Sequence, residues 1–355
     1  MSGVITARFS PRPSLRFSPR PSLARVLDAA IETTVVPSFS RVGIALRRRL
    51  EGWDDAPPMN GQVAVVTGGT SGIGLAAAGA MAGLGATVHL VGRDAARAHQ
   101  ARAAVEAAGP APVHLDLVDL SDPEAVVALG LRLAERYDRV DVLVHNAGSL
   151  SRVYEVTPAG VEVTVATQVL GPYVLTATLA PLLWRSAPAT IVTVSSGGMY
   201  TQRFDLEHLE MTTDSYDGVV AYARCKRAQV VLADAWARRF GPVGVASFAM
   251  HPGWVDTPGL KAGLPRFEAF WRPLLRSPAE GADTVVWLAA GGPASQASAL
   301  GVPTPASGFF HDRRRRRDHR FPVSRPTRPG DDNALLAWCA ARTGIMAPLP
   351  ADGGH

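Results

Sequence analysis

Tyr222 and Lys226, four positions apart in "AYARCKRA", have the types and the spacing for acid–base chemistry. On a helix this spacing places both side chains on one face. A phenol has an ordinary pKa of about 10, and an adjacent cation stabilises its phenolate. The chain holds lysine only at 226 and 261 and otherwise uses arginine, which indicates that a compact ammonium is required here. The pair therefore predicts a tyrosine tuned for proton transfer.

A serine and a buried amide lie in two other apolar runs. Ser196 ends the run "IVTVSS", and its hydroxyl could hold a substrate oxygen against the phenol. Gln168 lies in "VTVATQVLGPYVLT", residues 163–176, which is apolar enough for a buried helix. Burying an amide without partners costs about 1–3 kcal/mol. Gln168 therefore either faces a polar site or is bonded locally.

The elements that must position these residues form an alternating series between residues 60 and 311. Short β-branched runs are separated by alanine-rich helical stretches, and strands are expected at 62–67, 87–92, 112–117, 139–148, 189–196, 244–253 and 307–310. Apolar strands that alternate with helices predict the α/β class, with a doubly wound parallel sheet covered on both faces. In such sheets ligands bind beyond the carboxyl ends of the strands.

A glycine-rich turn, "TGGTSGIG", follows the first expected strand and precedes a helix. Glycines let the turn close tightly, and the backbone N–H groups then reach a pyrophosphate at the helix N-terminus. Tight turns and helix caps use the same residues, so it is the place after the first strand that favours a nucleotide site. The candidate cofactor-binding residues here are Thr67, Gly68, Thr70, Ser71, Gly72, Ile73 and Gly74.

The end of the second expected strand favours NADP over NAD. Gly92 stands where an NAD site would place an acidic residue for the ribose hydroxyls, and Arg93 could pair with a 2′-phosphate. In the alternative reading, Asp94 is a helix N-cap and Arg93 is only solvated.

The third and fourth expected strands end in residues that suit other parts of a dinucleotide. Asp116 and Leu117 are suited to an adenine amino group, and Asn146, Ala147 and Gly148 let a flat ring or a ribose lie close to the backbone. Such residues are common in turns, so each is weak evidence alone. Their weight comes from falling at successive strand ends.

These motifs together resemble the short-chain dehydrogenase/reductase family over about 250 residues, from "NGQVAVVTGGTSGIG" to "SGFFHDR". The resemblance implies a Rossmann-like fold, a nicotinamide cofactor, and hydride transfer between that cofactor and an alcohol or a carbonyl. It implies that Tyr222 is the general acid–base, that Lys226 lowers its pKa and binds the nicotinamide ribose, and that Ser196 orients the carbonyl. In "HPGWVDT" it places against the nicotinamide the residues Pro252, Gly253 and Thr257.

Gln168 departs from the family, which has an asparagine at this position. The asparagine side chain bonds the backbone locally, and its main-chain carbonyl holds a water that is linked to the lysine. A longer amide displaces that local bond, and small displacements at a catalytic site can cost tenfold or more. The carbonyl survives the substitution, so we expect catalysis that is retained at a reduced rate. The segment "MYTQRFDLEHLEMTTDSYDG" is an insertion beside the site.

The expected substrate is a lipophilic ketone, aldehyde or alcohol. This expectation rests on apolar residues of segment 254–275, which could form a lid over the site or pack against the domain or a neighbouring subunit. A rival interpretation is a catalytically weak NADP(H)-binding scaffold or sensor. Nucleic-acid binding through the arginine runs is disfavoured, because aromatic residues do not interleave them.

The ends of the chain differ in composition from the middle. Residues 1–23 carry the repeat "RFSPRPSL", which predicts a disordered tail. Residues 24–59 predict a helical extension that lies on the domain, or else a peripheral membrane anchor. Residues 312–355 contain the run from Arg313 to Arg317 and predict a solvated basic tail.

Bulk composition sets the remaining expectations. The chain has 355 residues, 47% of them hydrophobic, and its formal net charge is +5. This suits one large domain with N- and C-terminal extensions and without a transmembrane segment. Cys225 and Cys339 offer no disulfide framework and no metal-ligand spacing, which indicates a reducing compartment, the cytoplasm. The family resemblance further implies a homo-oligomer.

Overall fold

The computed structural model describes residues 23–350. The predicted tail over residues 1–23 lies outside this range apart from Leu23, which begins the first helix. The eight-stranded sheet has the order β3-β2-β1-β4-β5-β6-β7-β8. Its strands are β1 (Val63–Thr67), β2 (Thr87–Gly92), β3 (Val113–Leu117), β4 (Val142–His145), β5 (Ala189–Val194), β6 (Val245–Met250), β7 (Ser307–His311) and β8 (Arg314–Arg316).

The first seven strands are parallel, as their alternation with helices predicts. Strand β1 pairs with β2 on one side and with β4 on the other. The strand order therefore reverses between β1 and β4, and their carboxyl ends meet at one edge of the sheet. This is the place where an open α/β sheet binds its ligand.

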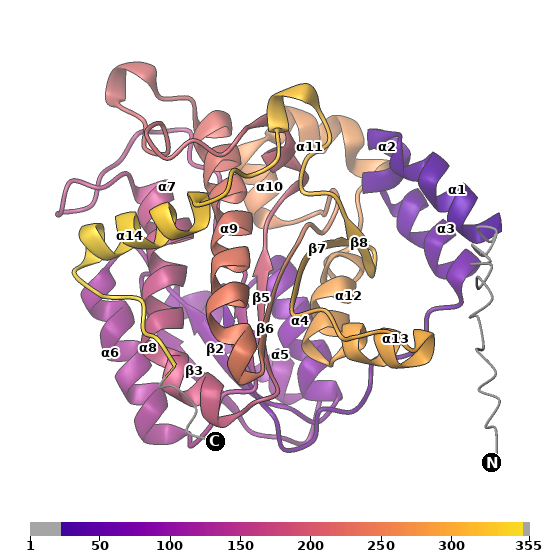
Figure 1. Ribbon diagram of the computed structural model, residues 1–355, viewed down its shortest axis with the longest axis horizontal. Coiled ribbons are helices and arrows are strands. Elements are labelled where there is room, and N and C mark those ends of the chain that lie inside the picture. Colours follow the sequence, from indigo (N-terminus) through magenta and orange to yellow (C-terminus); the bar gives the residue numbers. More distant parts are fainter. Residues whose placement is uncertain (1–22, 351–355) are drawn as a thin grey trace, which may run out of the picture.

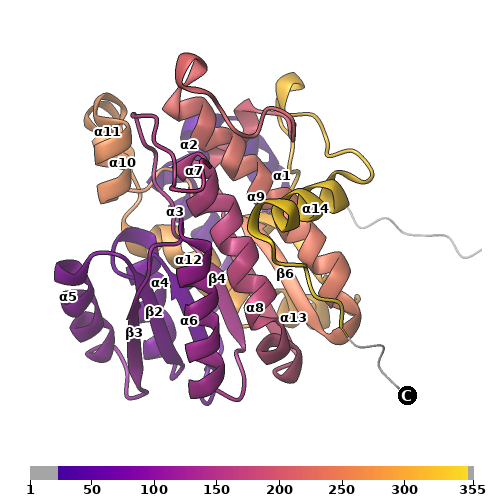
Figure 2. The ribbon, with the colours of Figure 1, turned by 90° about the vertical axis from the view of Figure 1, so that its left-hand side faces the viewer.

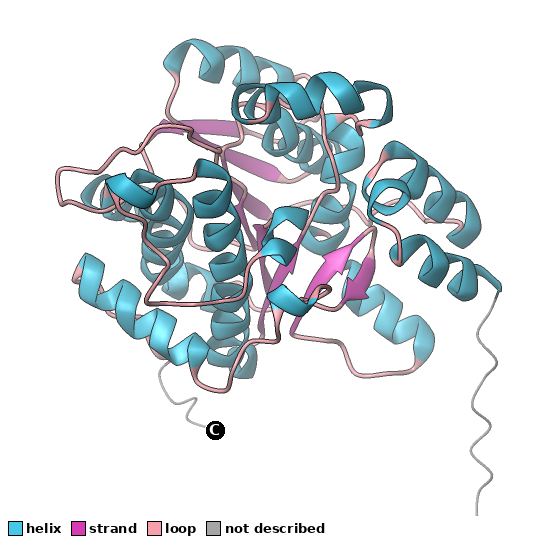
Figure 3. Cartoon of the chain, turned by 90° about the horizontal axis from the view of Figure 1, so that it is seen from above, coloured by secondary structure: helices cyan, strands magenta, loops and turns pink. Residues whose placement is uncertain are grey.

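Helices cover both faces of the sheet, so its apolar strands are buried on both sides (Figure 3). One face carries α4 (Gly72–Gly83), α5 (Ala95–Glu106) and α12 (Pro278–Ala289). The other carries α6 (Pro123–Arg136), α8 (Gly171–Arg185) and α9 (Gly218–Phe240). The predicted Rossmann-like, doubly wound fold is confirmed.

The segment Val163–Arg185 is a continuous helical stretch in the core. It consists of α7 (Val163–Val165), one π-helical turn η1 (Ala166–Leu170) and α8. Its length and apolar composition would suffice to cross a membrane, but 83% of its most apolar window is buried inside the protein. We therefore assign it to the core. The π turn contains Gln168, and such turns are frequent at functional sites.

Three short helices precede β1 and dock at the β8 edge of the sheet (Figure 1). They are α1 (Leu23–Glu32), α2 (Val35–Phe39) and α3 (Arg41–Glu51). A buried ionic network joins them to the sheet. Arg47, fully buried, binds Asp28 at 2.8 Å, Glu32 at 2.7 Å and Asp312 at 2.6 Å.

The prediction of a solvated basic tail after residue 311 is wrong. Asp312 is 1% exposed, and the arginine run that follows it forms the antiparallel edge strand β8. Arg316 binds Asp28 with two hydrogen bonds of 2.7 Å, and Arg314 binds Glu51 at 2.6 Å. Arginines of the run thus form ion pairs with acidic side chains of the N-terminal helices. These partners are distant in the sequence, so the run alone could not predict them.

Further along, α14 (Asp331–Thr343) packs against α9 and buries Leu335, Leu336 and Cys339 (Figure 2). The C-terminal segment is therefore part of the folded domain. The remaining helices are α10 (Pro258–Gly263), α11 (Pro265–Trp271) and α13 (Gly292–Leu300), with short 3-10 turns that include η2 (Gly197–Thr201).

Candidate active site

The glycine-rich turn closes against its own backbone. Gly68 and Gly72 have φ angles of +63° and +54°, which glycine adopts without strain. A β-carbon on Gly74 would lie 2.3 Å from the main-chain oxygen of Gly68. The Ser71 side chain makes no capping hydrogen bond to α4, so the first N–H groups of this helix remain available to an anionic ligand. Ile73 lies in the first turn of α4.

Thr67 and Asn146 hold the turn to the end of β4. The buried Thr67 hydroxyl donates to Val144 O at 3.2 Å and accepts from the amides of Asn146 and Ala147 at 3.0 and 3.2 Å. The Asn146 side-chain amide donates to the main-chain oxygens of Thr67 and Gly68 at 3.0 and 3.1 Å. Both side chains thus shape the cradle from within the protein.

At the end of β2, Gly92 packs against the glycine-rich turn and Asp94 caps the next helix. A β-carbon on Gly92 would lie 2.5 Å from Thr70, so the glycine-rich turn packs directly on this strand end. Asp94 caps α5 by accepting from the Arg97 amide, and its carboxylate binds the Arg97 side chain at 2.7 Å. Asp94 is thus the N-cap of the alternative reading, whereas Arg93 is exposed beside the cradle.

The Asp116 carboxylate already has two partners within the protein. It lies 2.9 Å from Arg132 Nε and 2.9 Å from His89 Nε2. Burial lowers the pKa of His89 to about 4, so its ring is neutral and can donate to the carboxylate. The suitability of this side chain for an adenine amino group stays a prediction, since each carboxylate oxygen can accept a further hydrogen bond. Leu117, 48% exposed, is left at the strand end.

Tyr222 and Ser196 lie together, on α9 and at the end of β5. Burial raises the pKa of Tyr222, and hydrogen bonding with the Ser196 hydroxyl opposes this shift. The same hydroxyl accepts from the Gly198 amide at 3.2 Å. Lys226 Nζ lies 5.4 Å from the centre of the Tyr222 ring. Burial therefore dominates the pKa of this phenol, and its lowering by Lys226 stays a prediction.

Lys226 is 3% exposed and is held by neutral oxygens. Its ammonium donates to Val194 O and to Gln229 Oε1, both at 3.0 Å. Burial lowers its pKa to about 8. Ser195 donates to the main-chain oxygen of Lys226 at 2.8 Å and so ties α9 to β5. Of the two adjacent serines, only Ser196 is left facing the phenol.

Gln168 is fully buried, and its side chain is bonded as the resemblance implies. Its Nε2 donates to Ser149 O at 3.0 Å, in the loop that follows β4. A β-carbon on Gly148 would lie 2.8 Å from Gln168 Oε1, so the glycine makes room for the longer amide. The main-chain oxygen of Gln168 accepts from Gln229 Nε2 at 2.7 Å. Through Gln229, a side chain links this carbonyl to the lysine.

The sequence from residue 62 to 264 matches the family model described as short chain dehydrogenase. The chain belongs to the short chain dehydrogenase family. It is similar to human dehydrogenase/reductase SDR family member 12, with 38% identity over 78% of this chain and 84% of that protein. It is 33% identical to mouse retinol dehydrogenase 14 over 68% of this chain and 77% of the relative.

The fold of this short chain dehydrogenase is also found in solved structures. One is a short chain dehydrogenase from Burkholderia cenocepacia in complex with NADP, 25% identical, with a TM-score of 0.55. The alignment covers 71% of this chain and 96% of that structure. The family model begins at residue 62, so helices α1 to α3 lie outside the matched range.

In this dehydrogenase the loop after β6 rests on the N-terminal helices. The Trp254 amide donates to Phe39 O at 2.8 Å, and Arg276 Nη1 donates to Pro252 O at 3.1 Å. Gly253 has a φ angle of +77°, and a β-carbon there would lie 2.5 Å from Phe39 O. Phe39 and Arg276 therefore position the loop that is expected to face the nicotinamide. Sequence motifs gave no signal for either residue.

Thr257 joins the same loop to the glycine-rich turn. Its hydroxyl caps α10 by accepting from the Leu260 amide at 3.2 Å, and its methyl carbon would lie 3.1 Å from a β-carbon on Gly72. The sheet thus brings together the turn after β1 and the loop after β6, as their shared strand-end position predicts.

The segment from residue 254 to 275 of this dehydrogenase packs on itself and reaches the loop that follows β4. Trp254 contacts Phe267 and Trp271, each with ring centres 5.1 Å apart. A β-carbon on Gly263 of α10 would lie 2.9 Å from the Leu150 side chain, so α10 touches the loop that follows β4. Phe270 is 74% exposed and contacts Trp271, with ring centres 5.0 Å apart.

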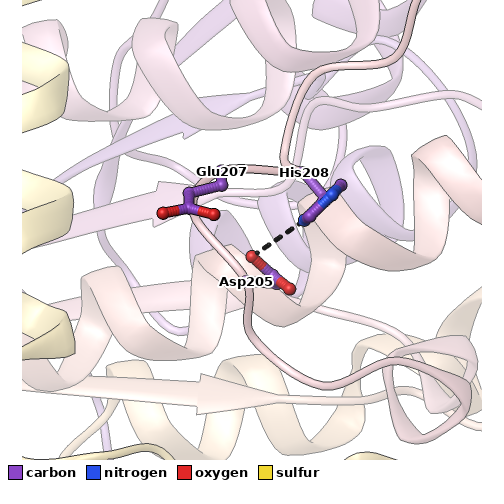
Figure 4. Close-up of side chains that lie close together, drawn as sticks. All are labelled: Asp205, Glu207 and His208. Carbon is purple, nitrogen blue, oxygen red and sulfur yellow. Dashed lines mark ion pairs between the residues drawn. The ribbon is translucent and has the colours of Figure 1, made fainter.

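The insertion between Ser196 and Tyr222 carries a cluster of polar side chains, Asp205, Glu207 and His208 (Figure 4). His208 Nδ1 lies 3.2 Å from Asp205 Oδ1, and Arg203 binds the other oxygen of that carboxylate at 3.0 Å. The glutamate and the histidine are exposed. Because ion pairs already occupy the Asp205 carboxylate, we assign no metal to this cluster.

Proposed function

We propose that this chain is an NADP-dependent oxidoreductase that moves a hydride between the nicotinamide and the carbonyl or alcohol carbon of a lipophilic substrate. One observation carries the proposal. Tyr222 and Lys226 share a helix face beside Ser196, at the strand ends where the α4 N-terminus is open to a dinucleotide.

Tyr222 is suited to give a proton to the substrate oxygen. Its raised pKa keeps the phenol protonated at neutral pH, so carbonyl reduction finds the acid in its active form. Ser196 holds the substrate oxygen beside the phenol. The bound cofactor supplies the hydride, and the proton from Tyr222 balances the alkoxide that results. In the reverse direction, the phenolate accepts the alcohol proton.

The NADP preference rests on the β2 end. Gly92 places no anion there, and Asp94 is turned into the α5 cap with Arg97 as its partner. Arg93 is left exposed to meet a 2′-phosphate. The NADP named for the structural relative from Burkholderia cenocepacia supports the same preference.

The proposal of a lipophilic substrate rests on the apolar side chains of segment 254–275 and of the loop after β4. The aromatic cluster of Trp254, Phe267 and Trp271, together with Leu150, offers apolar surface on the segments that follow β6 and β4. Such surface favours an apolar body with one polar oxygen. The name of the mouse relative, a retinol dehydrogenase, agrees with this class.

The test is a panel of apolar aldehydes, ketones and their alcohols, with NADPH oxidation or NADP reduction as the readout. Tyr222→Phe should lower kcat by about 10²-fold or more while NADPH still binds. Tyr137→Phe, which removes a phenol that contacts His89 at 3.1 Å, is the matched control and should keep full activity. NADPH binding without turnover across the panel would instead identify a cofactor-binding scaffold.

A further inference from the structure

The Lys226 ammonium is held at two of its three N–H groups. One is bound by Val194 O of β5, and one by Gln229 Oε1 from the next turn of α9. The lysine side chain is 3% exposed, so water does not compete for these positions. One N–H remains for a ligand, and its direction is set by the other two.

Gln229 makes a hydrogen bond at each end of its amide. Oε1 accepts from Lys226 at 3.0 Å, and Nε2 donates to the main-chain oxygen of Gln168 at 2.7 Å. The side chain is 1% exposed, and these two contacts satisfy an amide whose burial would otherwise be costly. A helix spacing of three residues puts Gln229 beside Lys226 on α9.

The other end of this bridge is itself fixed. Gln168 lies in the π turn, and its side chain donates to Ser149 O in the loop after β4. In a π-helical turn the main-chain hydrogen bonds are displaced from the α-helical pattern. The Gln168 carbonyl is thereby able to face α9 and to receive the Gln229 amide. The bridge therefore connects the lysine to the loop at Gly148 and Ser149.

We propose that Gln229 is a positioning residue, which fixes the Lys226 ammonium by binding it and the Gln168 carbonyl at the same time. This inference rests on the proposed function, because it assigns to Gln229 the orientation of a lysine that serves Tyr222 and the cofactor. A carboxylate in this place would hold the ammonium more tightly, whereas an amide holds it without adding a charge. Gln229 thus fixes the direction of the Lys226 ammonium and still allows this group to lose a proton.

The two-lysine composition of the chain allows a direct test. Protein labelled with ¹³C at the lysine side chains gives signals from Lys226 and Lys261 alone, and each can be titrated by NMR without cofactor or substrate. Lys261, with 53% side-chain exposure, is the internal reference. The titratable groups nearest Lys226 are the phenol of Tyr222 and the thiol of Cys225, and both are unchanged in the variants below.

Gln229→Met keeps the volume but removes the acceptor, so the Lys226 titration should move to lower pH. Gln229→Glu adds a negative partner and should move it to higher pH. Neither should move Lys261. The NADPH dissociation constant of Gln229→Met should rise about five- to tenfold, the range for one lost hydrogen bond. Val231→Ala, a buried change on the same helix, controls for a loss of packing and should leave the Lys226 titration in place.

A Lys226 titration that is the same in wild type, Gln229→Met and Gln229→Glu would overturn the proposal. So would shifts of the same size in Val231→Ala, because they would report general loosening of α9. If Gln229→Met does not fold, Gln229→Asn gives the same comparison, since its amide is too short for both contacts. The titration needs no turnover, so an inactive substrate panel would refute the proposed function and leave this result standing.

Discussion

Arg276 Nη1 and Nη2 bind the two carboxylate oxygens of Asp312 at 2.6 and 2.9 Å, and each side chain is about 1% exposed. Arg47 reaches the same carboxylate from α3 at 2.6 Å. Burial alone would raise the pKa of Asp312, but the two guanidinium groups hold it below its ordinary value. This carboxylate therefore joins the N-terminal helices, the segment that precedes α12 and the end of β7.

We expect Asp312→Ala to destabilise the protein strongly. It leaves the Arg47 and Arg276 charges buried with one partner fewer, and breaking a buried pair costs about 3–5 kcal/mol. The free energy of unfolding from urea titration measures the loss. Glu106→Ala, which breaks an exposed pair with Arg102, should cost less than about 0.5 kcal/mol. Equal losses in the two variants would contradict the role of Asp312.

Cofactor preference should depend on Arg93. Arg93→Ala should weaken NADPH binding about ten- to hundredfold, because a hydrogen bond to a charged group is worth about 1.5–3 kcal/mol, and leave NADH binding unchanged. Fluorescence titration with both cofactors measures this difference. Arg97→Ala is the matched control, since Arg97 binds Asp94 on the same helix. If wild type binds NADH as tightly as NADPH, the assignment of Arg93 fails.

Gly148 and Gln168 should be energetically coupled. Gly148→Ala places a β-carbon about 2.8 Å from Gln168 Oε1 and should lower kcat by displacing the amide. In a Gln168→Asn background the shorter side chain leaves space, so the same alanine should do less harm. A double-mutant cycle on kcat should show a coupling of about 0.5–3 kcal/mol. Additive effects would mean that the two residues act separately.

The rate of carbonyl reduction should fall as pH rises through about 8, where Lys226 loses its proton. Tyr222 keeps its proton over this range because burial raises its pKa. The stability contribution of Lys226 has the opposite sign. Its pKa in the fold, about 8, lies below the ordinary 10.5, so the fold gains stability from this group as pH rises between those values. We therefore expect kcat to fall above pH 8 while the contribution of Lys226 to the free energy of unfolding does not fall. A rate that rises above pH 8 would contradict this prediction.

Much of this architecture follows from local sequence. All seven parallel strands were predictable, because each is a short apolar run bounded by a helical stretch, and parallel pairing brings their ends to one edge. Tyr222 and Lys226 were predictable from spacing alone. Gln229 was within reach of the same reasoning, since it follows Lys226 by three positions, but its partner is the Gln168 carbonyl, and a main-chain atom carries no sequence signal.

Other parts depend on contacts between distant segments. The Arg313–Arg317 run has the composition of a solvated tail, and only acids such as Asp28 and Glu51, from the other end of the chain, convert it into a paired strand. Asp116 lies at a strand end, and its contact with Arg132 from the next helix could not be predicted from that strand alone. The composition of one segment does not reveal whether its charged side chains are buried, because burial requires oppositely charged side chains from another segment.

The partnership of Arg47 with Asp312 also sets an order of assembly during synthesis. The ribosome makes Arg47 265 residues before it makes Asp312. Until then the buried Arg47 guanidinium would lack one of its three carboxylate partners, and the edge strand whose Arg316 binds Asp28 does not exist. Helices α1 to α3 are therefore expected to dock only after β7 and Asp312 have been made, and Phe39 can bind the loop after β6 only at that stage.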